Sequence, residues 1–299
     1  MCGDPDASRV VAGLEPDMTP PDTSGERMLA VVIPAYNEAA TIADVLRRVD
    51  ALRCVREIIV VDDGSKDRTA RNVEDFRSER VRLIRQNENR GKTAAIRRGV
   101  AEVTSPLTII QDADLEYDAD EIPYVIEPIL AGRADVVYGS RFLVRRAARV
   151  LYFYHFLANK GLTFCSNLLT NRNMTDIETC YKAFRTPIIQ KLPLTSRGFG
   201  MEVEITAIVS KTNARTYEVP ISYYGRTYEE GKKIGVRDGL AAGWYILYYN
   251  LLAPLTRRYR TYIRTINDWL RTAPVSGVAP VSSRCEPGAT PAADSPSHL

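Results

Sequence analysis

Between residues 29 and 138 the chain alternates short apolar runs with stretches in which apolar residues recur every three or four positions. The runs predict five β-strands, at 29–34, 57–61, 81–85, 107–111 and 134–138. The stretches between them predict helices at 38–51, 67–77 and 92–103. Continuous apolar strands separated by helices are typical of a parallel sheet covered on both faces, so the pattern predicts an α/β fold.

Polar residues follow each of the predicted strands. In sheets of this kind, ligands bind outside the carboxyl ends of the strands. The polar residues therefore predict one binding site at a single edge of the sheet, built from residues 36–38, 62–65, 87–92, 112–120 and 139–141.

The segment IIQDADLEYDAD, residues 109–120, places five carboxylates at alternate positions: Asp112, Asp114, Glu116, Asp118 and Asp120. Like charges this close repel one another, and a divalent cation would relieve that repulsion. Because oxygen ligands suit Mg²⁺ or Mn²⁺, we expect Asp112 and Asp114 to bind one of these ions together with a diphosphate. A solvated acidic loop is the alternative for this short motif, and the residues from Asp118 onward fit the start of a helix.

Composition and charge exclude some classes of function. The formal net charge of +3 is too small to indicate nucleic-acid binding, and it is compatible with an anionic substrate or membrane surface. The five cysteines are scattered, which predicts reduced thiols and no structural zinc. The N-terminus lacks the apolar core of a signal peptide, so we expect a cytoplasmic protein. Its oligomeric state is left open.

Residues 239–255, GLAAGWYILYYNLLAPL, carry no charge and precede Arg257, Arg258 and Arg260. The segment is shorter than the roughly 20 apolar residues of a transmembrane helix. We expect a helix that packs on the domain or lies in the membrane interface, with a membrane-spanning helix as the alternative.

The order of the motifs resembles the nucleotide-sugar glycosyltransferases of family 2, which have the GT-A fold. The matching segments are VVIPAYNEAATI, IIVVDDGSKDRT, NENRGKTAAIRRG, QDADLEYDAD, YGSRF, MTDIETCYKAF, GFGMEVEI, YEVPISYYGR and EGKKIG. They run from about residue 29 to residue 240. Within the family they look most like the synthases that transfer mannose or glucose to dolichyl or polyprenyl phosphate.

This resemblance implies a set of site residues. Those implied to bind the nucleotide sugar are Pro34, Tyr36, Glu38, Asp63, Lys92, Asp112, Ala113, Asp114, Lys232 and Lys233. Asp63 would contact the base, while Asp62 would brace the turn. The implied metal ligands are Asp112, Asp114 and Glu116, the last at a position where several relatives carry Gln. The implied catalytic residues are Asp114, Arg141 and Arg226, and either Lys232 or Lys233 would join the two arginines at the diphosphate or acceptor phosphate.

The resemblance and the composition together suggest boundaries. We expect a GT-A catalytic domain at 28–240, with a nucleotide-sugar half at 28–144 and an acceptor half at 145–240. Amphipathic or apolar helices are expected at 241–272. Residues 1–27 and 273–299 are rich in Pro, Ser and Gly, which predicts disordered tails.

The implied reaction is transfer of a hexose from GDP-mannose or UDP-glucose to a polyprenyl or dolichyl phosphate, with inversion. A lipid phosphate is already anionic and needs no base. Basic residues beside aromatics at 145–164 favour such an acceptor at the cytosolic face of a membrane, although a solvated amphipathic helix is the alternative. A hydroxyl acceptor would need a base, for which Asp176 and Glu202 are candidates. A non-catalytic scaffold that binds nucleotide or lipid is the remaining hypothesis.

Overall fold

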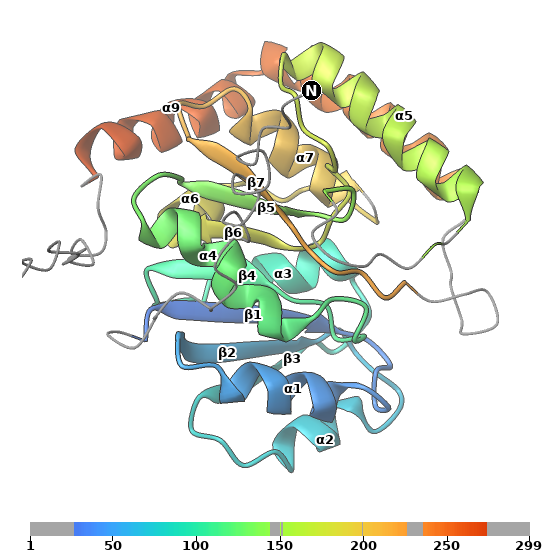
Figure 1. Ribbon diagram of the computed structural model, residues 1–299, viewed down its shortest axis with the longest axis vertical. Coiled ribbons are helices and arrows are strands. Elements are labelled where there is room, and N and C mark those ends of the chain that lie inside the picture. Colours follow the sequence, from blue (N-terminus) through green and yellow to red (C-terminus); the bar gives the residue numbers. More distant parts are fainter. Residues whose placement is uncertain (1–26, 144–149, 151, 199, 226–235, 274–299) are drawn as a thin grey trace, which may run out of the picture.

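The computed structural model describes residues 27–143, 150, 152–198, 200–225 and 236–273 of the 299-residue chain. A seven-stranded sheet in the order β3-β2-β1-β4-β6-β5-β7 forms its centre (Figure 1). Its strands are β1 (Leu29–Ala35), β2 (Val55–Asp62), β3 (Val81–Arg85), β4 (Leu107–Ile110), β5 (Val136–Ser140), β6 (Lys182–Arg185) and β7 (Thr216–Pro220). All neighbouring strands pair in parallel except β6, which is antiparallel to both β4 and β5.

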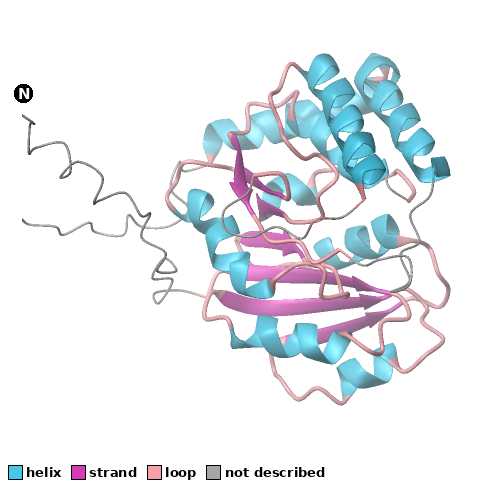
Figure 2. Ribbon diagram, turned by 45° about the vertical axis from the view of Figure 1, so that its right-hand side comes forward, coloured by secondary structure: helices cyan, strands magenta, loops and turns pink. Residues whose placement is uncertain are grey.

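Helices cover both faces of the sheet (Figure 2). In the first half they are α1 (Ile42–Ala51), α2 (Thr69–Glu74), α3 (Lys92–Val100), η1 (Ala119–Glu121) and α4 (Ile122–Leu130). In the second half they are α5 (Phe153–Thr170), α6 (Thr186–Gln190), α7 (Gly200–Val209), α8 (Val236–Leu247), η2 (Tyr248–Leu252), η3 (Ala253–Leu255) and α9 (Arg257–Thr272). The predicted α/β fold with a mostly parallel sheet is confirmed.

The boundaries differ from the sequence prediction in specific places. The helix expected from residue 38 begins at Ile42, because the preceding residues form the turn that leaves β1. The strand expected at 134–138 lies at Val136–Ser140. Strands β6 and β7 were not predicted. The segment around Glu202, which the sequence analysis did not assign to a strand or a helix, is helix α7.

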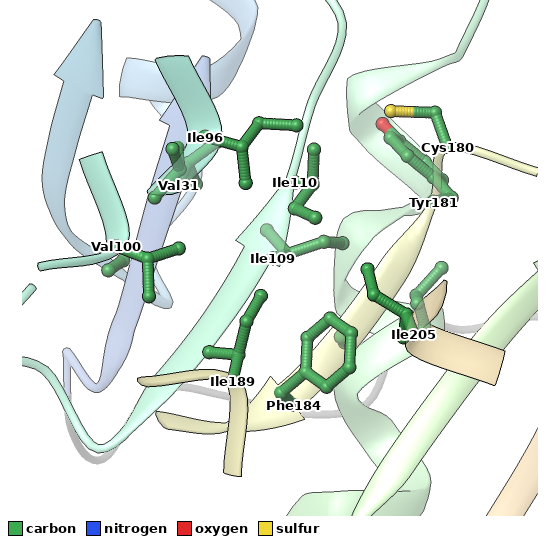
Figure 3. Close-up of a cluster of buried hydrophobic side chains, with 14 of the residues drawn as sticks. Val31, Ile96, Val100, Ile109, Ile110, Cys180, Tyr181, Phe184, Ile189 and Ile205 are labelled. Atoms are coloured by element: carbon green, nitrogen blue, oxygen red, sulfur yellow. The ribbon is translucent and has the colours of Figure 1, made fainter. Parts of the chain in front are cut away.

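The core lies where α3, α6 and α7 meet the central strands. Figure 3 shows this cluster, with the labelled side chains Val31, Ile96, Val100, Ile109, Ile110, Cys180, Tyr181, Phe184, Ile189 and Ile205. Helix α3 approaches the sheet closely at Gly99, where a Cβ atom would lie 2.6 Å from Cγ1 of Val32. This glycine therefore sets the distance between α3 and the strands that hold the site.

Helices α5, α7, α8 and α9 gather at the end of the molecule beyond β5 and β7 (Figure 1). None of the helices in the described residues has the length and apolar character needed to cross a bilayer. Apart from Arg27 and Ala273, the predicted tails lie outside the described residues.

Candidate active site

The turn after β2 is held by two adjacent aspartates. The carboxylate of Asp63 accepts hydrogen bonds from the backbone N–H groups of Arg90 (2.9 Å) and Gly91 (2.7 Å). Asp62 accepts a longer bond of 3.3 Å from Ser65 N–H. Both aspartates are buried. Asp63 thus braces the loop before α3, a bracing role that the sequence analysis assigned to Asp62 alone.

Gly64 allows the turns after β2 and β3 to touch. Its φ of 72° lies in the left-handed region, and a Cβ atom there would lie 2.8 Å from the carbonyl carbon of Glu88. A side chain at this position would push the two turns apart, because backbone cannot move aside as a flexible side chain can.

The turn after β1 is joined to the same loops. Asn37, with a φ of 55°, donates its N–H to Ser65 Oγ (2.9 Å) and accepts from Lys66 N–H at its side-chain oxygen (2.8 Å). Tyr36 beside it is exposed, and Pro34 is partly buried. These two residues of the implied nucleoside site therefore lie at the edge formed by the β1 and β2 turns.

Thr41 connects this turn to the acidic segment. Its hydroxyl donates to the carbonyl of Ala113 (2.7 Å), which lies between the two aspartates of the motif. The backbone N–H of Glu38 donates to Thr69 Oγ1 (2.8 Å). The turn after β1, which carries Tyr36 and Glu38, is therefore connected to the acidic motif through the hydroxyl of Thr41.

The acidic segment folds as a tight turn rather than an extended strand. Leu115 has a φ of 54°, and Asp114 accepts a hydrogen bond from the N–H of Glu116 (3.1 Å). The carboxylate of Glu116 accepts from the hydroxyl of Tyr223 (2.8 Å). Further along, Asp118 caps η1 through its side chain, as the sequence predicted. Within the described residues, no three Asp, Glu, His or Cys side chains gather into a cluster that could hold a metal ion by themselves.

Lys92, the first residue of α3, lies between two carboxylates. Its ammonium is 2.7 Å from Asp112 Oδ1 and 3.9 Å from Glu202 Oε1. Burial alone would lower the pKa of Lys92, but the Asp112 charge holds that pKa well above its usual value. Glu204 faces elsewhere and accepts from the N–H of Thr195. Of the two glutamates of α7, Glu202 is therefore the one at the site.

Arg141 and Asp176 form a buried ion pair. Nε and Nη2 of Arg141 donate to the two oxygens of Asp176 at 2.7 and 2.8 Å, and the Arg141 backbone N–H adds a third bond at 3.1 Å. The Arg141 guanidinium also lies 5.1 Å from the ring centre of Tyr223. Although burial opposes it, the Arg141 charge keeps the pKa of Asp176 below its usual value. A carboxylate so paired is a poor proton acceptor, which argues against Asp176 as a base.

A second group of titratable side chains lies behind Glu202. Burial, reinforced by the charge of Glu202, raises the pKa of Glu178 to about 8. One oxygen of Glu178 and one of Glu202 are buried without a hydrogen-bond partner. The fully buried Lys182 ammonium donates to the carbonyl of Ile177 (3.1 Å) and also to that of Thr179. The sequence did not identify Lys182, because a lysine in a short strand ordinarily indicates a solvated position.

Three residues that the sequence assigned to the site, Arg226, Lys232 and Lys233, lie outside the described residues. Two others, Thr41 and Tyr223, were not singled out. Both are polar residues inside segments that carried the family resemblance, and that position was the available signal.

Residues 30–192 match the model of the family described as glycosyl transferase family 2. The chain is 30% identical over 212 residues to a dolichol-phosphate mannosyltransferase of Pyrococcus furiosus, covering 69% of this chain and 59% of that protein. It is 28% identical over 213 residues to an undecaprenyl-phosphate 4-deoxy-4-formamido-L-arabinose transferase of Edwardsiella ictaluri, covering 69% and 63%. The match thus spans less than two thirds of either relative's length.

Among solved structures, the fold is similar to glucosyl-3-phosphoglycerate synthase from Mycobacterium tuberculosis. Its complex with UDP has a TM-score of 0.60 and 19% identity, covering 75% of this chain and 80% of that one. Its complex with Mn²⁺, UDP and phosphoglyceric acid has the same TM-score and identity, covering 75% and 79%. At this identity the similarity establishes a shared fold.

Proposed function

Because the chain belongs to glycosyl transferase family 2, we propose that it moves a hexose from GDP-mannose or UDP-glucose to a polyprenyl or dolichyl phosphate, with inversion and with a divalent metal. One observation carries this proposal. Hydrogen bonds and an ion pair bring the Asp63 turn, the Asp112–Asp114 turn and Lys92 together at one edge of the sheet. The relatives named for dolichol-phosphate and undecaprenyl-phosphate transfer support a lipid-phosphate acceptor.

The residues present fit a divalent cation that is shared with a diphosphate. Asp112 and Asp114 supply carboxylate oxygens from one turn, and Asp112 already holds a positive charge, the Lys92 ammonium. Mg²⁺ commonly takes one or two protein carboxylates and completes its shell with substrate phosphates, so Asp112 and Asp114 would suffice together with the diphosphate. Glu116 stays the further ligand that the family resemblance implies. When bound, Mg²⁺ or Mn²⁺ would neutralise the diphosphate as a leaving group.

The reaction is a single displacement at the anomeric carbon. An oxygen of the acceptor phosphate forms a bond to that carbon as its bond to the diphosphate oxygen breaks. The protein has to hold both partners in line and supply positive charge, and no side chain has to accept a proton. Among the arginines that the structure describes, we assign Arg141, which Asp176 holds in place, to the binding of the phosphates. Arg226 and Lys232 or Lys233 are proposed to assist it.

The surface beyond β7 supports an acceptor held in a membrane. Large apolar side chains are exposed along two helices that pack together, α5 and the α8–η3 segment: Phe153, Tyr154, Phe156, Leu157, Phe164, Leu168, Leu240, Trp244, Leu247, Tyr248, Leu251, Leu252 and Leu255. Neither residues 142–171 nor residues 239–267 contain an Asp or Glu.

The exposed face of α9 adds positive charge beside this apolar surface. Arg257, Arg258, Arg260 and Arg264 are all exposed on it. Apolar and aromatic side chains flanked by arginines suit an interface with anionic lipids. This surface supports the proposal that the protein lies at the cytosolic face of the cell membrane, in peripheral contact with it. The double change Trp244→Glu with Leu255→Glu should abolish co-sedimentation with anionic vesicles. The change Arg77→Glu, at an exposed position on the opposite end of the sheet, alters the net charge by the same amount and should not.

A transfer assay tests the proposed reaction. Purified protein would receive GDP-mannose or UDP-glucose labelled in the sugar, polyprenyl phosphate and Mn²⁺, and organic-extractable label would be counted. Asp114→Asn should abolish transfer, whereas Asp118→Asn, a change in the same segment at the η1 cap, should retain it. Absence of lipid product from both donors would refute the lipid-phosphate acceptor.

Transfer to a hydroxyl acceptor is the second candidate, because Glu202 is a buried carboxylate with one unpartnered oxygen at the site. In that case Glu202 would accept the proton of the acceptor hydroxyl, and Glu202→Gln would abolish transfer at every pH. Donor binding without transfer to either class of acceptor would instead favour a non-catalytic scaffold.

A further inference from the structure

Lys92 occupies the carboxylate that the proposed reaction assigns to a metal. Its ammonium contacts Asp112 Oδ1 at 2.7 Å, the distance of a charge-assisted hydrogen bond. No other Lys or Arg of the described residues forms an ion pair with Asp112. A divalent cation on the same oxygens would meet a positive charge at close range. The repulsion between the two positive charges would favour movement of Lys92 away from Asp112 when the donor and its cation bind.

A second acceptor for the ammonium lies next to it. Glu202 Oε1 is 3.9 Å from Lys92 Nζ, so a shift of about 1 Å would make a hydrogen bond of ordinary length. The Glu202 side chain is only 5% exposed, and its other oxygen is buried without a partner. A buried carboxylate that has an oxygen without a hydrogen-bond partner is stabilised when a cation reaches it.

The backbone around Lys92 allows such a shift without moving the helix. Asp63 holds the N–H groups of Arg90 and Gly91, which fixes the loop immediately before the lysine. The Lys92 side chain is one-third exposed and carries four rotatable bonds, so its ammonium can pivot about a fixed Cα.

We propose that Lys92 is a built-in counter-cation that moves between two carboxylates: it neutralises Asp112 in the donor-free protein and moves to Glu202 when donor and metal bind. Glu202 is then a positioning residue that acts through Lys92. This inference rests on the metal-dependent reaction proposed above. It explains how Asp112 and Asp114 can lie one residue apart before a cation arrives.

Mn²⁺ binding in the absence of sugar transfer tests this arrangement. Free Mn²⁺ would be measured by electron paramagnetic resonance, first with protein alone and then with GDP or UDP added. Lys92→Met should tighten Mn²⁺ binding by about five- to tenfold, because the competing cation is gone. Glu202→Gln should weaken it about fivefold, because Lys92 then has Asp112 as its only partner. Arg98→Met, which removes a charge from the exposed face of the same helix, should change nothing.

The double variant shows whether Glu202 acts through Lys92 or changes Mn²⁺ affinity directly by its own charge. If Glu202 acts through Lys92, then adding Glu202→Gln to Lys92→Met should leave Mn²⁺ affinity at the value of Lys92→Met alone. Should Glu202→Gln fail to fold, Glu202→Asp keeps the charge but shortens the reach, and it should weaken binding in the same way.

Unchanged or weaker Mn²⁺ binding in Lys92→Met would overturn the inference, as would additive effects in the double variant. Absence of Mn²⁺ binding by the unaltered protein, with and without nucleotide, would also overturn it and would count against a metal-dependent reaction. A failure confined to the variants would leave the proposed reaction standing.

Discussion

The Arg141–Asp176 pair allows a quantitative test of how the site is held together. Asp176→Ala removes three hydrogen bonds to Arg141, at 2.7, 2.8 and 3.1 Å, and leaves a guanidinium whose side chain is 13% exposed. Removing one partner of a buried ion pair destabilises a protein by about 3–5 kcal/mol. For a domain of this size, that loss corresponds to a fall in Tm of roughly 6–20 °C.

The sign of the pH dependence follows from the lowered pKa of Asp176. Its stabilising contribution is complete above the carboxyl's usual pKa of 3.8 and is lost as the pH falls through the lower folded-state pKa. The difference in Tm between Asp176→Ala and the unaltered protein should therefore be constant from pH 6 to pH 8. It should shrink below about pH 4.

Calorimetry on a variant that lacks both residues of the pair tests whether the unpaired charge causes the loss of stability. Replacing both partners, with Arg141→Met and Asp176→Leu, removes the buried charge together with its partner, and this should recover most of the lost stability. Transfer activity should remain absent in the double variant, because Arg141 is assigned to the phosphates. A Tm of the single variant within about 2 °C of the unaltered protein, less than the smallest fall expected for a broken buried pair, would refute the reasoning.

Three further predictions concern the core and its buried titratable groups. Gly99→Ala should destabilise the protein by about 1–3 kcal/mol in denaturant unfolding, because the new methyl group would lie 2.6 Å from Val32 Cγ1; a stabilised variant would show that α3 can move away. The pKa of Glu178 in the folded protein is raised to about 8, so its contribution to stability falls as the pH rises from the usual carboxyl pKa of 4.5. Glu178→Gln should therefore raise Tm more at pH 9 than at pH 5, and an effect independent of pH would contradict this. In a variant in which Cys2 and Cys285 are already serine, exposed Cys165 should react with a thiol reagent long before Cys54, whose pKa burial raises to about 11, and adding Cys165→Ser should abolish the fast phase.

The sequence predicted the first half of the fold well because its strands are long and continuously apolar. Strand β2, for example, has five consecutive buried residues at its end. Strand β6 was missed because it has only four residues, two of them charged, so it lacks both the length and the composition of a buried strand. Its Lys182 is nevertheless fully buried, because carbonyl groups of the preceding loop accept its hydrogen bonds. That arrangement depends on the tertiary structure and leaves no periodic signal.

The site was predicted to a similar degree. The sequence predicted that Asp63, Asp112 and Lys92 lie at one edge, because they follow predicted strands and a parallel sheet brings the carboxyl ends of its strands together. The partners of these residues could not be predicted. Arg141 and Asp176 are 35 positions apart, and no spacing rule connects them. Nor does any local pattern indicate that Asp63 braces the loop 27 residues later.

Strand β6 explains why the two halves of the chain build one site. It lies between β4 and β5 and is antiparallel to both, so its N-terminal end is at the edge where β4 and β5 end. The loop that leads into β6 therefore arrives beside the acidic turn, and it carries Asp176 and Glu178. Helix α7 then places Glu202 Oε1 3.9 Å from the ammonium of Lys92, which belongs to the first half of the chain. A wholly parallel sheet would bring the start of β6 to the opposite edge, so the single reversed strand is what allows residues of the second half to meet the acidic turn and Lys92.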